Sequence, residues 1–245
     1  MSKVPSPTES REPACRVRAC ASPALWVPLV VGLLVFVAAR NVVLNLFYVE
    51  GMYFLDAGWF AHMPWRNDWT LTSPPGHPAG EVPFLRRHLA FVLIPLNALS
   101  HLIDTDHAAF FSLWFAGIFA FGYWIGWLLA GDALHRAGVR GPWSALLASG
   151  FGALFALNGV SLSTLLYPHP EVLMAFAIAG LFWSIEQDRP GLAWLFGVIA
   201  LGTRTDGGFH VALFSAVGVV CALTGRSSIS AGDARSGGAG STLMA

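Results

Sequence analysis

The sequence predicts an all-α, polytopic transmembrane helix bundle, with about six crossings and further juxtamembrane helices on the outer face. The first observation is composition: of 245 residues, 55% are hydrophobic and only 11% are charged, whereas soluble domains carry about 25% charged residues. The second is a mean hydropathy of +0.60. The third is a series of apolar runs, several of them near the ~20 residues that a bilayer crossing needs.

Seven apolar runs define the expected elements in chain order, after a polar cytoplasmic tail at 1–24. The first run also suits a cleaved signal peptide, but it continues to residue 47, which favours an uncleaved helix. The run 89–103 is short and contains Pro95 and three polar residues, which is typical of an interfacial or re-entrant helix. A Gly/Ser-rich tail at 225–245 is expected to be disordered. The runs are 25–47, 89–103, 108–130, 142–159, 171–186, 191–203 and 207–224.

The positive-inside rule orients this bundle. With the N-terminus in the cytoplasm and 89–103 on the outer face, nine Lys and Arg residues lie inside and four lie outside. If 89–103 crosses instead, five lie inside and eight outside, so the first topology is favoured. It predicts a multi-pass protein of the inner (plasma) membrane, with a transmembrane domain over 25–224 and a long outer loop over 48–88. The same topology puts seven of eight histidines at or near the outer face: His62, His77, His88, His101, His107, His169 and His210.

Charge and cysteine content exclude some functions. The formal net charge is zero and no basic cluster stands out, which argues against nucleic acid as a partner. The cysteines Cys15, Cys20 and Cys221 have no metal-ligand spacing, and they indicate neither a disulfide framework nor a zinc site. The partner that the composition predicts is the lipid bilayer.

The first candidate site follows the first apolar run, where Asp56 lies among aromatic residues. Residues 52–63 predict a juxtamembrane helix in the headgroup region, with Trp59 and Trp65 among its interfacial anchors. A structural interpretation of Asp56 is a solvated carboxylate that caps a turn. The functional interpretation is a general base whose pKa is adjusted by partial burial.

The second candidate is His169-Pro170-Glu171, where two prolines bracket the histidine just before a helix. Glu171 falls in the first helical turn, where a negative charge suits the helix dipole, and this structural role is one interpretation. The other is that His169 and Glu171 project into an outer cavity and bind phosphate or a metal ion.

The third candidate is the turn Arg204-Thr-Asp-Gly-Gly-Phe-His210. Asp206 and His210 are four residues apart, so they would share one face of a helix. A structural Arg204–Asp206 ion pair is the alternative interpretation. His88 comes just before the 89–103 segment, where a lone histidine is also common as an amphipathic residue at a wet boundary.

These motifs together resemble an uncharacterised family of polytopic bacterial membrane proteins. The resemblance runs through Asp56-Ala57-Gly58-Trp59-Phe60, His88, His169-Pro170-Glu171 and the acidic turn at Asp206, over about residues 25–224. The fold of that family is similar to the GT-C membrane glycosyltransferases, so the bundle is expected to be a GT-C-like N-terminal half. Two departures from GT-C enzymes are visible: Asp56 lacks the paired second acid, and such enzymes have roughly twice as many crossings. The departures predict a truncated chain.

The resemblance implies a polyprenyl-phosphate sugar as a lipid-linked donor, used on the outer face. Asp56 would be the catalytic residue that activates the acceptor. The substrate-binding residues implied are His88, His169, Glu171, Arg204 and Asp206. No cofactor is implied with certainty; a divalent cation or arginines would stabilise the departing phosphate.

Two other functions stay open at this stage. A non-enzymatic transporter subunit or membrane assembly protein would also be apolar and polytopic, although transporters usually place ionisable groups near the bilayer midplane. Metal handling through the outer histidines is a third, but the sequence holds no His-x-x-x-His or Cys-x-x-Cys pair.

Overall fold

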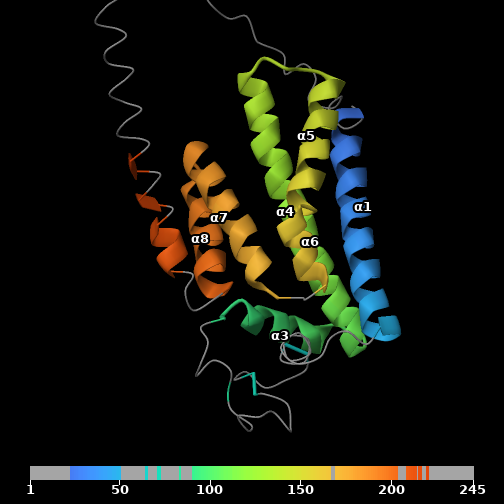
Figure 1. Cartoon of the computed structure of the whole chain (residues 1–245). Helices are drawn as coiled ribbons and strands as arrows, with labels where there is room; N and C mark the ends of the chain where they lie inside the picture. Colours follow the sequence, from blue (N-terminus) through green and yellow to red (C-terminus); the bar gives the residue numbers. More distant parts are fainter. Residues whose placement is uncertain are drawn as a thin grey trace, which may run out of the picture.

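The computed structural model is a helical bundle whose helices stand side by side (Figure 1). It describes residues 23–50, 64–65, 71–72, 83, 90–166, 169–203, 208–213, 215–216 and 219–220. Within these ranges the secondary structure is helical, apart from turns and one isolated bridge between Thr72 and Pro83. The all-α prediction is therefore confirmed for the described part of the chain. The tails at 1–22 and 221–245 lie outside it, as does most of the expected outer loop at 48–88.

Six helices form the bundle. The first, α1 (Pro23–Asn45), continues into the short π-helix η2 (Leu46–Glu50), and the longest is α4 (His107–Arg136). The remaining helices are α5 (Pro142–Ala156), α6 (Gly159–Leu166), α7 (Glu171–Glu186) and α8 (Pro190–Thr203).

Two described helices, α1 and α4, are long and apolar enough to cross a membrane. A third span arises if α5 and α6, which are bent by 55° at their junction, count as one. The 16 residues of α7 and the 14 of α8 reach only about 24 and 21 Å, against a hydrocarbon core of about 30 Å. The structure thus has two or three candidate spans, which agrees with a membrane protein, and it does not confirm six crossings.

The helix α3 (Leu93–Leu102) is oriented differently from the others, because it lies across one end of the bundle (Figure 1). It presents Leu93, Asn97 and Ser100 to the interior, where all three are buried. Just before it, the Val92 amide donates to the carbonyl of Gly202 at the end of α8, at 3.0 Å. An interfacial helix requires this orientation, and its position relative to a bilayer stays a prediction.

Close packing in the middle of the bundle depends on small residues. At the crossing of α4 and α5, a Cβ added to Gly152 would lie 2.8 Å from the backbone oxygen of Tyr123, so the two backbones touch. A Cβ on Gly122 would lie 2.5 Å from the ring of Phe176 in α7. Glycine is therefore required at these approaches. In contrast, Gly117 in α4 has open space beside it.

The chain direction gives the bundle two distinct ends (Figure 1). We call one the loop end, because it carries the connections 137–141 between α4 and α5 and 187–189 between α7 and α8. We call the other the α3 end, because it carries α3, η2 and the starts of α4 and α7.

Candidate functional site

Two of the six predicted site residues are described, His169 and Glu171, and they lie at the α3 end. The other four lie outside the described residues: Asp56, His88, Arg204 and Asp206.

His169 and Glu171 contact each other directly. His169 Nδ1 lies 3.2 Å from Glu171 Oε2, and the two side chains are 35% and 27% exposed. Pro170 between them has αR dihedrals and serves as the N-cap of α7, and its carbonyl accepts the amide of Leu173 at 2.9 Å. This proline pre-sets the first turn, so that residues 169 and 171 face each other across it.

The pair agrees with both interpretations of this motif. Glu171 occupies the first turn of α7, where the helix dipole favours its charge, although the N-cap makes no side-chain hydrogen bond. It also contacts the imidazole, which orients the ring and favours its protonated form. A partly exposed, carboxylate-oriented histidine at the end of an apolar bundle can donate a hydrogen bond to an anionic group.

A second polar group at the α3 end surrounds Asp106. This carboxylate caps α4, since Oδ1 accepts the Ala109 amide at 2.8 Å, and it also accepts the hydroxyl of Tyr48 at 3.1 Å. The Ala109 amide, followed by the Tyr48 hydroxyl, lowers the pKa of Asp106 below its ordinary value. Asp106 thereby ties η2 to the start of α4. An aspartate directly before an apolar run is an N-cap signal, and it could have identified this residue from sequence.

His107 follows Asp106 and lies among aromatic rings. Its ring centroid is 5.5 Å from that of Phe47 and 5.4 Å from that of Trp65. Aromatic contacts of this kind place the imidazole in packing rather than in an open site. The expectation of Trp65 as an aromatic anchor near the first outer loop stays a prediction, because nothing here places it relative to lipid.

A divalent cation is the cofactor considered from the sequence. Within the described residues, no group of three or more His, Cys, Asp or Glu side chains is arranged to hold a metal ion. His169 and Glu171 supply two donors, and a protein site for a hard cation normally uses more oxygen ligands or keeps several waters. The described part of the site therefore does not fit a resident cation by itself.

The loop end carries a different set of charges. Arg136 at the end of α4 is hydrogen-bonded to Asp132 on its own helix, and to Glu186 at the end of α7 at 2.7 Å. Gln187 also donates to Asp132, at 2.8 Å. These bonds join two helices that are 50 residues apart in sequence.

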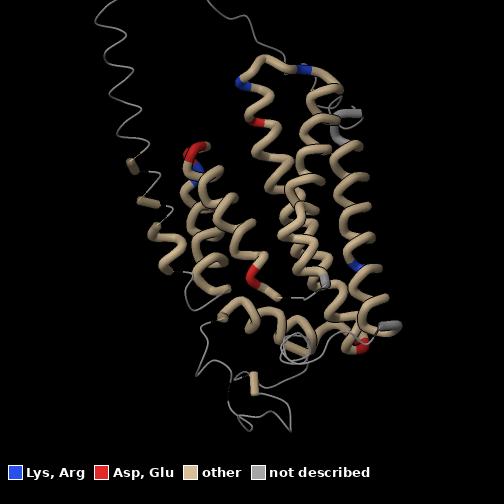
Figure 2. Tube along the Cα trace, in the orientation of Figure 1, with Lys and Arg blue, Asp and Glu red and all other residues tan. Residues whose placement is uncertain are grey.

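The distribution of charge between the ends is uneven (Figure 2). Of the four described arginines, three lie at the loop end, and Arg40 lies within α1. The described acids of the α3 end are Asp104, Asp106 and Glu171, accompanied by His101, His107 and His169. The arginines at 136, 140 and 189 thus share one end, as the predicted topology requires.

Comparisons with protein-family models, with curated proteins and with solved structures find no match for this chain. The likeness to GT-C enzymes therefore stays an expectation from the short motifs.

Proposed function

We propose that this chain is a GT-C-like integral membrane glycosyltransferase, or the N-terminal half of one, that uses a polyprenyl-phosphate sugar donor. In this proposal the α3 end faces the outer side of the inner membrane, and the loop end and the N-terminus face the cytoplasm. The three arginines at the loop end support that orientation through the positive-inside rule.

The observation that carries the proposal is the His169–Glu171 contact of 3.2 Å at the α3 end. Residues two apart join no separate helices, so the contact adds little to the tertiary structure, and binding is the better account of it. A histidine held by a carboxylate is a donor suited to a phosphate oxygen at a membrane surface.

In the proposed reaction, Asp56 takes the proton from an acceptor hydroxyl. The acceptor oxygen then attacks the anomeric carbon of the sugar in line, and the bond from that carbon to the phosphate oxygen breaks. Polyprenyl phosphate leaves with the electron pair. His169 donates to the phosphate, Glu171 is a positioning residue that orients the imidazole, and Arg204 neutralises the departing charge. His88 and Asp206 complete the substrate-binding set implied by the resemblance.

The direct test is sugar transfer by purified chain in vesicles that contain a radiolabelled polyprenyl-phosphate sugar. Asp56→Asn should reduce turnover by about 100-fold or more, because the amide cannot accept the proton. The matched control is Asp104→Asn, an acid at the α3 end that the mechanism does not use. Near-normal turnover of Asp56→Asn, with full-length product recovered, would remove Asp56 from the mechanism.

The orientation has its own test. In a background with Cys15, Cys20 and Cys221 replaced by serine, His169→Cys should react with an impermeant thiol reagent added outside intact cells. Arg140→Cys should react only after permeabilisation. The reverse pattern would place position 169 on the cytoplasmic side and end the proposal.

A non-enzymatic transporter subunit is the second candidate, and the broken helix favours it. Transporter sites often form at discontinuous helices, and α5 and α6 meet at 55°. Asn158 stabilises this break, since its Oδ1 accepts the amides of Val160 and Ser161 and its Nδ2 donates to the Phe155 carbonyl. A proton or sodium flux in proteoliposomes that Asn158→Ala alters, with no donor binding, would favour this function over sugar transfer. A membrane assembly protein would show neither activity.

A further inference from the structure

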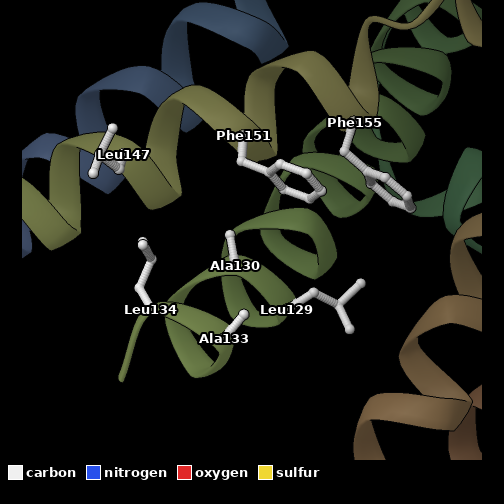
Figure 3. Close-up of a pocket in the computed structure, with 7 residues that line it drawn as sticks. All are labelled: Leu129, Ala130, Ala133, Leu134, Leu147, Phe151 and Phe155. Atoms are coloured by element: carbon white, nitrogen blue, oxygen red, sulfur yellow. The ribbon is translucent and has the colours of Figure 1, made fainter. Parts of the chain in front are cut away.

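An apolar hollow opens between α4 and α5 in the half of the bundle near the loop end (Figure 3). Its volume is about 410 Å³, within the range of about 300–1,000 Å³ found for small-molecule sites. Figure 3 shows the two alanines and the phenylalanine rings directed toward the space between the helices. The lining residues are Leu129, Ala130, Ala133, Leu134, Leu147, Phe151 and Phe155.

The hollow exists because of how the two helices cross. They touch at Gly126 and Gly152, where an added Cβ on Gly126 would lie 3.0 Å from the Cα of Gly152. From that contact the helices separate toward the connection 137–141 (Figure 1). On this side α4 presents Ala130 and Ala133, whose single methyl groups do not fill the widening gap.

The hollow lies at the depth of hydrocarbon. Its α4 wall belongs to the candidate membrane span His107–Arg136, and its α5 wall extends from Leu147 to Phe155, about 12 Å along the helix. Leu147 and Phe151 are 54% and 49% exposed. An apolar cleft that opens to the lipid phase at this depth is suited to a hydrocarbon chain.

The polar end of the hollow carries positive charge. Arg140 lies in the connection that joins the two walls, next to Gly141, which caps the start of α5 without a side-chain hydrogen bond. The unsatisfied amides at this helix start add a partial positive charge at the same level. Trp143, one turn further on and 69% exposed, is the residue type that anchors at the headgroup level.

Neighbouring acids do not offset Arg140. Asp132 and Glu186 are both bonded to Arg136, and no ion pair of Arg140 is present among the described residues. The mouth of the hollow is therefore complementary to a negative headgroup, and its wall to an acyl chain.

The later part of this chain occupies a different surface. Val211, in the described segment 208–213, packs with the cluster of Leu181 and Phe196 on α7 and α8, and Gly208 lies near Leu201. Within the described chain, the hollow is lined by α4 and α5 alone. Its occupant must then come from outside the described residues.

We propose that this hollow binds one acyl chain of an anionic phospholipid, whose phosphate is held at Arg140. The bound lipid fills the gap between α4 and α5 and holds their ends at a constant separation. This inference stands apart from sugar transfer, because the hollow is at the opposite end from His169 and Glu171.

The test is native mass spectrometry of the whole chain released from nanodiscs of equal phosphatidylglycerol and phosphatidylcholine. The wild-type chain should retain one phosphatidylglycerol. Arg140→Gln should lower the preference for the anionic lipid by about fivefold, since a basic residue at the surface contributes about that factor. Arg189→Gln, which removes the same charge from the same end, is the matched control and should leave the preference unchanged.

A second variant tests the cleft itself. Ala133→Phe places a ring in the hollow and should abolish retention of either lipid, whereas Ala38→Phe, at an exposed position on α1, should not. Equal retention of the two lipids by the wild type, or full retention by Ala133→Phe, would overturn the proposal. So would a dimer mass that Ala133→Phe removes, because a second copy would then be the occupant. If Ala133→Phe does not fold, the Arg140→Gln and Arg189→Gln pair decides alone.

Discussion

The two ends of the bundle use their charged side chains in different ways. At the loop end, Arg136 connects α4 to α7 through Glu186, across 50 residues of sequence. At the α3 end, His169 contacts Glu171 across a single residue. The first contact joins two helices, whereas the second joins no separate elements.

This difference separates structural from functional polar groups. A long-range ion pair restricts how two helices sit, and its sequence spacing makes it a tertiary contact. A contact within one turn restricts only the side chains that make it, which is what a binding group needs. Asp106 belongs with the structural groups although it lies at the α3 end, because it caps α4 and holds Tyr48 of η2.

The largest expected effect comes from a change midway between the ends, which should damage both. Gly152→Leu forces a side chain against the backbone oxygen of Tyr123, 2.8 Å from the new Cβ, and should cost about 3 kcal/mol or more. Thermal unfolding in detergent measures the loss. Gly150→Leu is the matched control, because open space surrounds Gly150. Equal melting temperatures for the two variants would show that the α4–α5 contact is looser than described.

The next effect should be confined to the α3 end. His169→Ala removes the proposed phosphate donor and should raise KM for the lipid-linked donor by roughly 10- to 100-fold, with a smaller change in kcat. Glu171→Gln, which leaves the imidazole without its carboxylate, should give part of that increase and shift the pH profile of KM. His135→Ala, an exposed histidine near the loop end, should leave both constants unchanged. An unchanged KM in His169→Ala would refute the functional role of this pair.

A smaller effect should identify Asp106 as a structural group. Asp106→Ala removes a helix cap and should cost about 0.5–2 kcal/mol of stability, while Asp106→Asn keeps a capping oxygen and should lose less. Because folding lowers the pKa of Asp106, its contribution is present above the unfolded pKa, about 4, and declines as the pH falls through the lower folded value. Melting temperatures of the wild type and Asp106→Asn should therefore converge in acid. A constant difference down to low pH would contradict the assignment.

The smallest effect belongs to the loop end. Arg136 is 60% exposed, so Arg136→Gln should cost no more than about 1 kcal/mol, and the loss should shrink in high salt. Arg140→Gln, which makes no described ion pair, should not change the melting temperature in lipid-free detergent. A larger loss from Arg140→Gln than from Arg136→Gln would reverse the roles given to these two arginines.

Several features could be predicted from local sequence because they depend on neighbouring residues. The apolar run 171–186 coincides with α7, and Pro170 at its start is a helix-initiating signal that sets His169 beside Glu171. The run 108–130 ended too early: α4 continues to Arg136, because a helix that passes into polar surroundings no longer shows an apolar pattern. Likewise, the run 142–159 did not predict α6, which continues the chain beyond the break at Asn158.

The sequence by itself determined an apolar, all-α chain, the order of its helices and the local pairing around Pro170, since hydrophobicity and short-range sterics decide these. Only the tertiary structure decided that α3 lies across the bundle, that Arg136 meets Glu186 and that a hollow opens between α4 and α5. These depend on where helices touch, and a contact such as Gly126 against Gly152 is set by the mutual fit of two surfaces. No pattern within either helix encodes that fit alone.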